Sequence, residues 1–144
     1  MGDKQGGQCL CGAVAFRISV PEPVYSICHC GNCRRWSGGP LMSVHCPGDV
    51  EFDEPGAVAW YRSSEWAERG FCRTCGSSLF WRLAEDPGAM LIVSVDAFND
   101  ASEFKLSRHI FSDSAPERYA FADNCPRVTE AEVFAEFGAG DAGE

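Results

Sequence analysis

This sequence has no long hydrophobic run and few lysines. No stretch of its 144 residues approaches the roughly 20 consecutive apolar residues that a membrane-spanning helix needs. The start, Met1 to Gly7, is polar and glycine-rich, and it has no apolar core of the kind found in a secretory signal. We therefore expect no membrane association and a cytoplasmic location.

Positive charge is also scarce, because Lys4 and Lys105 are the only lysines. Twelve Lys and Arg residues face 21 Asp and Glu residues, and the formal net charge is -9. Proteins that bind nucleic acids in general need clustered basic side chains to neutralise phosphates. We expect no nucleic-acid partner, although a small anionic substrate could still bind to a local group of arginines.

Cysteine, by contrast, is abundant. The nine cysteines are an odd number, and most of them fall into C-x-C and C-x-x-C spacings. In a chain without a secretory signal, such spacings favour metal binding over a disulfide framework.

The pattern along the chain predicts a mainly β fold in one domain. Short alternating or apolar segments are separated by glycine and proline, as in proteins built from many short strands. A capping box at Thr129–Glu132 predicts one short helix that ends at Gly138. Residues 90–95 are almost all apolar and predict a strand that is buried on both faces, whereas 63–70 are expected to form a polar connection. The predicted strands cover residues 13–20, 41–46, 50–52, 57–61, 79–82 and 90–95.

Two outer cysteine pairs have the form of metal knuckles. They are Cys9-x-Cys11-Gly12 and Cys72-x-x-Cys75-Gly76. In such a knuckle a tight turn directs two sulfurs to one point, and the following glycine leaves room for backbone amides near the thiolates. Together the two pairs predict a closed four-cysteine zinc site with a structural role.

Cys28, Cys30 and Cys33 form a second set in the segment Cys28-His29-Cys30-Gly31-Asn32-Cys33, where Gly31 suggests a tight turn. Three interpretations remain open for it. The set could bind a second structural zinc completed by Cys46 or Cys125, or a zinc with an exchangeable fourth position. It could also be a redox pair of Cys30 and Cys33.

Charge favours thiol chemistry at a zinc held by three thiolates. Such a centre has a formal charge of about -1 and is a weak Lewis acid, better suited to binding an incoming thiolate than to making hydroxide. Arg34 and Arg35 follow directly and either orient a substrate carboxylate with forked hydrogen bonds or form a solvated pair. Alternation within C-x-C points His29 away from the metal, and His109 is either a proton shuttle or a buried structural histidine.

These motifs together resemble the glutathione-dependent formaldehyde-activating family, which includes relatives of centromere protein V. The resemblance rests on C-x-C-G at Cys9, C-H-C-x-x-C-R at Cys28, Ser37-Gly38, and F-C-x-x-C-G at Phe71. It continues through Arg108–Phe111 and covers roughly residues 7–127. Tyr119 stands where relatives often have tryptophan, so the pocket is expected to be reshaped there.

The resemblance implies a β-tent fold of layered antiparallel sheets with a zinc-knuckle staple and one short C-terminal helix. We expect a single zinc-binding domain over residues 1–138 and a flexible tail at 139–144. The implied ligands are Cys9, Cys11, Cys72 and Cys75 for a structural zinc, and Cys28, Cys30 and Cys33 for a catalytic zinc.

The family's named activity is the joining of glutathione to formaldehyde, a carbon–sulfur lyase reaction in reverse. We therefore expect a zinc-dependent enzyme that acts on a glutathione-like thiol and a small aldehyde. In this interpretation Cys28, Cys30 and Cys33 are catalytic, and Arg34 and Arg35 bind the substrate. The alternatives are a non-catalytic two-zinc binding module and a thiol redox protein.

Overall fold

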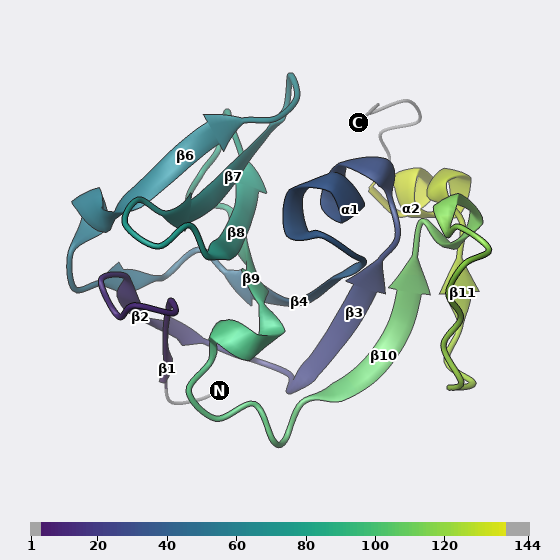
Figure 1. Ribbon diagram of the computed structural model, residues 1–144, viewed down its shortest axis with the longest axis horizontal. Helices are drawn as coiled ribbons and strands as arrows, with labels where there is room; N and C mark the ends of the chain where they lie inside the picture. The colour runs from purple at the N-terminus through teal and green to yellow at the C-terminus, as the bar shows by residue number, and fades with distance from the viewer. Residues whose placement is uncertain (1–3, 138–144) are drawn as a thin grey trace. The chain divides into compact units, whose positions relative to one another are not determined.

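The computed structural model describes residues 4–137, in which strands predominate as predicted (Figure 1). The chain divides into two compact units. One contains the residues up to Pro23 together with Val44–Phe104, and the other contains Val24–Ser43 together with the residues from Lys105 onward. Because each unit is assembled from separate segments, neither can form from one continuous piece of chain, and the single domain expected from the sequence stays a prediction. No helix within residues 4–137 is long and apolar enough to cross a membrane.

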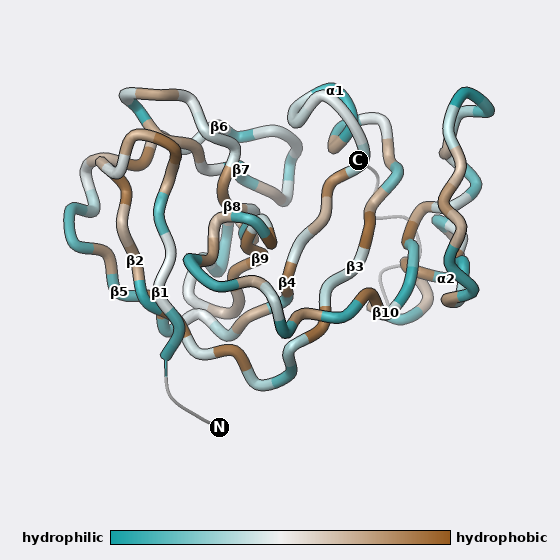
Figure 2. The backbone as a smooth tube through the Cα atoms, turned by 60° about the horizontal axis from the view of Figure 1, so that its bottom comes forward, coloured by the Kyte–Doolittle hydropathy of each residue, from teal (hydrophilic) through white to brown (hydrophobic). Residues whose placement is uncertain are grey.

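The first unit contains a small antiparallel sheet with the strand order β1-β2-β5. Its strands are β1 (Lys4–Gln8), β2 (Ala15–Ser19) and β5 (Glu51–Phe52). β1 was not predicted, because it consists of polar residues and glycines and lacks the alternation that β2 shows clearly (Figure 2). Backbone pairing with β2 and the close approach of Gly7 to the Phe16 ring hold it in place.

A larger antiparallel sheet in the same unit has its strands in the order β6-β7-β8-β9. They are β6 (Val58–Arg62), β7 (Ala67–Cys72), β8 (Ser78–Leu83) and β9 (Met90–Ser94). Short 3₁₀ turns, η1 (Pro55–Ala57) and η2 (Val95–Ala97), precede β6 and follow β9.

Two predictions need correction in this sheet. β7 occupies residues that were expected to be a polar connection, because pairing with strands on both sides satisfies its backbone; the Arg69 side chain on it is buried. β9 is not buried on both faces: Leu91 and Val93 are buried, whereas Met90 and Ile92 are half-buried. An apolar run alone does not reveal whether both faces of a strand are covered.

Aromatic side chains join the two sheets of the first unit into layers. The Phe80 ring on β8 packs edge-on against Phe16 of β2, at a centroid distance of 5.2 Å, and against Phe52 of β5, at 5.5 Å. Trp60 of β6 stacks on Phe80 at 6.0 Å. Burying one such aromatic side chain stabilises the fold by about 2 kcal/mol, so this cluster is a main source of stability for the unit.

In the second unit, β3 (Val24–Cys28), β10 (Lys105–Ile110) and β11 (Arg127–Val128) lie side by side (Figure 1). β4 (Leu41–Pro47) pairs antiparallel with β3 through its first three residues. The β3–β10 and β10–β11 pairings are parallel, unlike the other pairings described above. Parallel strands end at the same edge, so Cys28 and Ile110 are aligned, and the His29 amide donates to the Ile110 carbonyl at 3.1 Å.

Two helices complete the second unit. α2 (Glu130–Phe137) begins at the predicted capping box, where the Glu132 amide donates to the Thr129 hydroxyl at 3.2 Å and the Glu132 carboxylate bonds back to Thr129. The predicted end at Gly138 and the tail at 139–144 lie outside the described residues.

The other helix, α1 (Gly31–Ser37), was not predicted, since only one helix was expected and Gly31 was expected to form a tight turn. The Cys30 thiol caps this helix by accepting the Cys33 amide, and Gly38 ends it with a positive φ of 85°. A seven-residue helix that contains glycine and asparagine has little intrinsic stability, so tertiary packing decides its formation.

Candidate metal centres

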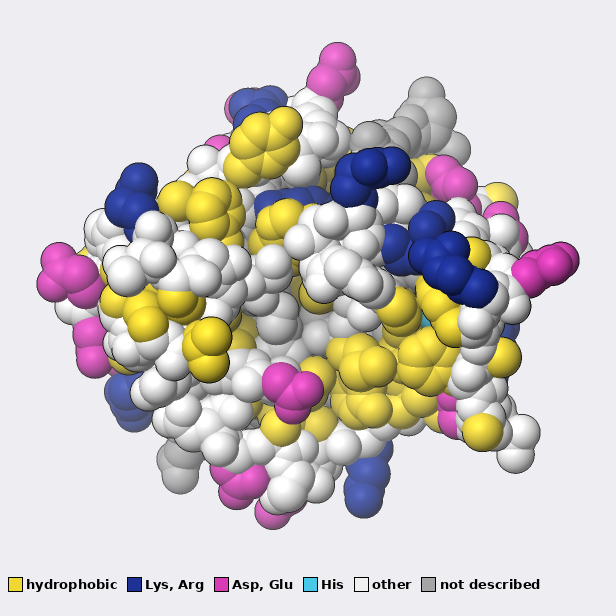
Figure 3. All heavy atoms as spheres, in the orientation of Figure 1, with side chains coloured by type: hydrophobic (Ala, Val, Ile, Leu, Met, Phe, Trp, Pro, Cys, Tyr) yellow, Lys and Arg dark blue, Asp and Glu magenta, His cyan; other side chains and the backbone are white. Residues whose placement is uncertain are grey.

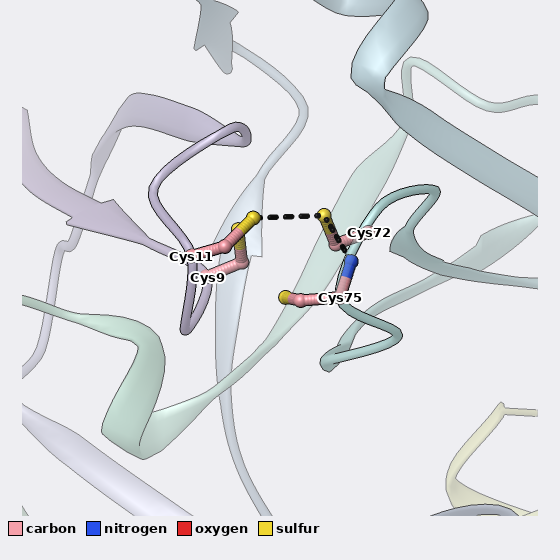
Figure 4. Close-up of side chains that lie close together, drawn as sticks. All are labelled: Cys9, Cys11, Cys72 and Cys75. Atoms are coloured by element: carbon pink, nitrogen blue, oxygen red, sulfur yellow. Dashed lines mark hydrogen bonds between the residues drawn. The ribbon is translucent and has the colours of Figure 1, made fainter.

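The four cysteines of the outer pairs converge in the first unit, as Figure 4 shows. The Cys9 and Cys11 sulfurs are 3.7 Å apart, and the Cys11 and Cys72 sulfurs are 3.8 Å apart. All four sulfurs, including that of Cys75, lie within 4.8 Å of one another. Four sulfurs placed tetrahedrally at 2.3 Å around a zinc ion would be about 3.8 Å apart. The observed spacing therefore fits a four-thiolate metal site.

The backbone around this cluster is shaped to direct amides at the sulfurs. Gly12 and Gly76 follow the second cysteine of each pair and have φ values of 86° and 82°, which favour glycine. The Val14 amide donates to Cys9 Sγ at 3.3 Å, and the Cys75 amide donates to Cys72 Sγ at 3.3 Å. Such donors stabilise thiolates, so they favour the ionised form that binds a metal.

The thiols of this cluster cannot all ionise easily without a cation. Hydrogen bonds from the Ser77 hydroxyl and amide lower the pKa of Cys75 to about 5. The pKa of Cys11 rises to about 11: although the Ala13 amide favours the thiolate, desolvation and the neighbouring cysteines outweigh it. A divalent cation would remove this mutual repulsion, which is a second reason why the donor set fits a metal.

The inner cysteines form a separate cluster in the second unit. Cys28 is the last residue of β3, Cys30 is the N-cap of α1, and Cys33 lies in the first turn of α1. All three are buried, and their sulfurs lie within 4.8 Å of one another. They belong to an apolar cluster that includes Leu41, Phe111, Val133 and Phe134.

This second cluster also favours a cation. Hydrogen bonds with Cys30 and Cys33, together with burial, strongly raise the pKa of Cys28. The pKa of Cys30 is also raised: its hydrogen bond with Cys28 opposes the shift, but the interaction with Cys33 and burial outweigh it. Three buried thiols cannot carry three negative charges together unless a positive ion compensates them.

No fourth His, Cys, Asp or Glu joins this cluster among the described residues of the second unit. The Cys125 thiol donates instead to the Leu106 carbonyl at 3.4 Å. Cys46 is fully buried in the first unit, and burial raises the pKa of its thiol to about 12. The structure therefore offers a three-cysteine ligand set rather than a closed one.

His29 points away from the sulfurs, as alternation predicts, and both of its ring nitrogens have other partners. Its Nδ1 is 2.9 Å from the Tyr119 hydroxyl, and its Nε2 is 2.8 Å from Nδ1 of His109. His109 Nε2 lies 2.9 Å from the Asp123 carboxylate. Both histidines were candidates from the sequence, but Asp123 was not, because no motif spacing connects it to them.

Arginines surround this region, and Figure 3 shows Lys and Arg side chains beside hydrophobic ones over the α1 and α2 side of the second unit. Arg34 is half-buried, and its Nε donates to the His29 carbonyl at 2.9 Å, whereas Arg35 is exposed. Burial raises the pKa of Tyr119, while the charges of Arg34 and Arg118 act in the opposite direction. Arg127 donates to the Asp123 carboxylate at 3.1 Å. Arg34 and Arg35 were predicted from the sequence, whereas Arg118 and Arg127 were not, because they lie far away in the sequence.

Comparison with known proteins gives consistent results. A family model described as glutathione-dependent formaldehyde-activating enzyme matches residues 4–114. A protein of Schizosaccharomyces pombe, named as an uncharacterized lyase, is 32% identical over 127 residues, which are 88% of this chain and 92% of that protein. A Halomonas elongata protein, whose name marks it as a candidate glutathione-dependent formaldehyde-activating enzyme, is 34% identical over 83 residues. That match covers 51% of this chain and 53% of the Halomonas protein.

A solved structure supports the fold. The crystal structure of a Rhodobacter sphaeroides protein superposes with a TM-score of 0.57 at 22% sequence identity. The superposition covers 71% of this chain and 99% of that protein. Since the family model spans most of the described residues and the yeast relative matches along nearly its whole length, the chain belongs to the family of glutathione-dependent formaldehyde-activating enzymes.

Proposed function

We propose that this protein is a zinc-dependent carbon–sulfur lyase that interconverts a thiol plus a small aldehyde with their S-hydroxymethyl-type adduct. Glutathione and formaldehyde are the substrates that the family description and the name of the Halomonas relative suggest. The proposal rests on one observation: three buried sulfurs converge in the second unit, and no fourth ligand joins them among its described residues.

Within this proposal, Cys28, Cys30 and Cys33 would hold a catalytic zinc, and a set of three protein ligands would leave room for a thiol substrate. The bound zinc would supply the positive charge that keeps an incoming thiol ionised near neutral pH. Arg34 and Arg35 lie on the helix that contributes Cys33, and they would pair with the carboxylates of a glutathione-like thiol. Such pairing fixes the direction in which the sulfur faces the aldehyde.

The reaction needs no redox partner. The sulfur donates an electron pair to the carbonyl carbon, a carbon–sulfur bond forms, and the π electrons move to the carbonyl oxygen, which then takes up a proton. In the reverse direction the hydroxyl loses its proton, the carbonyl re-forms, and the carbon–sulfur bond breaks to release the thiolate. Burial of the cysteines would limit competing contacts with water.

The cluster of Cys9, Cys11, Cys72 and Cys75 has a different role in the proposal. It holds a structural zinc, because four thiolates leave no position for a substrate. The turn after β1 and the turn after β7 are then tied together within the first unit.

Exchange NMR on glutathione and formaldehyde tests the proposal. The adduct forms unaided, so the quantity to measure is the acceleration of its formation and breakdown by zinc-loaded protein over the uncatalysed exchange. We expect acceleration with the unmodified protein and with Cys125→Ser, because the Cys125 thiol lies outside both clusters. We expect none with Cys30→Ser, which removes one ligand of the second cluster.

The alternatives predict different results. A two-zinc binding module would bind both zinc ions and give no acceleration with glutathione or other thiols. A redox protein would lose zinc from the second cluster on mild oxidation and form a reversible Cys30–Cys33 disulfide. Either result, together with the absence of acceleration by the zinc-loaded protein, would contradict the proposed lyase function.

A further inference from the structure

The three inner cysteines are covered so completely that a substrate thiol cannot reach them in this conformation. Cys28, Cys30 and Cys33 are only 7%, 3% and 5% exposed. A sulfur that joins a zinc ion held by these thiolates has to approach to about 2.3 Å from the metal. That approach needs an open path, and cysteines buried to this extent leave none. Part of the cover therefore has to move before a thiol can bind.

The cover consists of apolar side chains from three places in the second unit. The buried cluster that contains the three cysteines also includes Leu41, Phe111, Val133 and Phe134. Leu41 lies in β4 and is paired with Cys28 of β3, so the sheet fixes its position. Phe111 directly follows β10, where the Ile110 carbonyl accepts the His29 amide at 3.1 Å. These two parts of the cover are anchored to strands.

The third part of the cover, helix α2, is attached less firmly. Most of its residues are exposed, and its buried side chains are Val133 and Phe134. A helix of this length is marginal on its own, so these two side chains provide much of what holds it in place. At its other end Arg108 pairs with Glu136 at 2.7 Å, and partly exposed ion pairs contribute little to stability. Helix α2 is therefore the part of the cover that moves at the lowest cost.

Backbone strain next to α2 favours such a movement. Phe111 has a φ of 52°, in the left-handed region that bulky residues rarely adopt, and it is the one non-glycine residue with a positive φ within residues 4–137. Its ring packs edge-on against Phe134 with 5.7 Å between centroids. A strained conformation persists only while its surroundings hold it. Withdrawal of Phe134 would let Phe111 relax, which lowers the free-energy cost of uncovering the sulfurs.

We propose that α2 is a gate over the inner cysteine cluster, and that Val133 and Phe134 leave the cluster to admit the thiol substrate. The inference rests on the proposed function, because it names the movement that lets a thiol reach the second zinc. The closed gate keeps water away from the site, and the thiol takes the place of the two side chains when it binds. Exchange of the metal needs the same opening, so zinc itself serves as a probe of the gate.

The first test measures how fast EDTA removes zinc from each site of the zinc-loaded protein. The amide NMR signals of Asn32 and Thr74, which lie between ligands of the second and the first site, report the loss of each ion. Phe134→Leu keeps the cover apolar but makes it smaller. It should speed release from the second site about fivefold and leave the zinc affinity there, measured by competition, within about twofold. Release from the first site should not change.

Phe80→Leu is the matched control for this test, because it shortens a fully buried aromatic side chain of the first unit. It should lower stability without changing zinc release from the second site. An unchanged release rate in Phe134→Leu would overturn the proposal. Faster release would also overturn it if Phe80→Leu had the same effect, or if an equal loss of zinc affinity accounted for it.

The second test follows α2 while a thiol binds. The Val133 amide donates to the Thr129 carbonyl at 2.9 Å, so hydrogen exchange at Val133 reports opening of the helix. Glutathione should speed this exchange about fivefold in zinc-loaded protein. The Cys9 amide, which donates to the Val14 carbonyl at 3.0 Å in the first unit, should keep its rate. S-Methylglutathione should have no effect, because its sulfur cannot become a thiolate.

X-ray absorption on the same samples separates the failure of the gate from the failure of the proposed function. A fourth sulfur at the second zinc with unchanged exchange at Val133 would contradict the gate alone. The absence of a fourth sulfur in the presence of glutathione would contradict the proposed function, and the zinc-release comparison would still decide whether α2 is a gate.

Discussion

The sulfurs of Cys11 and Cys72 lie 3.8 Å apart, although 61 residues separate the two cysteines in the chain. Closing a loop of that length costs conformational entropy, which a metal bound by both cysteines would offset. The link joins the turn after β1 to the end of β7 within the first unit. It makes the outer cluster a candidate for holding the fold together, whereas the inner cluster is a candidate for chemistry.

Cys72→Ser and Cys30→Ser should therefore have different consequences. Cys72→Ser should lower the free energy of unfolding by about 4 kcal/mol or more, because it removes a ligand of the structural metal. Cys30→Ser should retain a folded protein with one zinc ion and no catalytic acceleration. Thermal unfolding and zinc content measure both effects, with Cys125→Ser as the control that keeps two zinc ions. Equal loss of fold in both variants would argue against separate roles.

Zinc X-ray absorption should reveal the open position. In zinc-loaded protein without thiol, one site with four sulfurs and one with three average to about 3.5 sulfurs per zinc. Added glutathione should raise the average to about 4, since its sulfur would complete the second site. An average of 4 before any thiol is added would mean that both sites are closed.

Arg35→Ala should weaken the binding of glutathione without changing the chemical step. Arg35 is exposed on α1, and losing a charged hydrogen bond to a carboxylate there should raise KM about threefold to tenfold while kcat stays constant. 2-Mercaptoethanol has no carboxylate, so its KM should not change. Arg17→Ala serves as a matched control, because Arg17 is also exposed but pairs with Glu51 in the first unit. A fall in kcat with both thiols would point to a different role for Arg35.

Gly7→Ala should destabilise the protein by about 1–3 kcal/mol. A Cβ atom at Gly7 would clash with the Phe16 ring and with the Ala97 carbonyl. Gly39→Ala is the comparison, because a Cβ atom there would meet nothing within 4 Å. Urea unfolding of both variants tests this, and equal stabilities would show that β1 can shift to make room.

Phe134→Ala should affect both stability and the second metal site. The Phe134 ring packs edge-on against Phe111 at 5.7 Å, in the apolar cluster that contains the three inner cysteines. Removing it should cost about 3–4 kcal/mol and lower zinc affinity at that site. Thr129→Ala, which removes only the helix cap of α2, should cost about 1 kcal/mol and leave zinc affinity unchanged. Calorimetry and zinc competition measure the two effects.

Motifs whose geometry depends only on residues close in the sequence could be predicted. The Cys9/Cys11 and Cys72/Cys75 knuckles were recognised because a C-x-C or C-x-x-C turn followed by glycine directs its sulfurs whatever surrounds it. The capping box at Thr129 was recognised for the same reason, as its hydrogen bonds span only three residues. The strand β2 was predictable because its alternating side chains place Phe16 and Ile18 on one buried face.

Features that depend on distant neighbours were missed. β1 contains no apolar residue and is a strand only because β2 pairs with it, and β7 needs β6 and β8 on either side. The helix α1 is too short to be stable alone and is capped by the thiol of Cys30.

By itself, the sequence determined which cysteines belong together, because thiol spacing and turn chemistry act over a few residues. Only the tertiary structure brought Tyr119, His109 and Asp123 to His29, since the parallel pairing of β10 with β3 brings together segments that are about 80 residues apart. Hydrogen bonds between such segments form only when the whole sheet aligns them. No local sequence pattern predicts these hydrogen bonds.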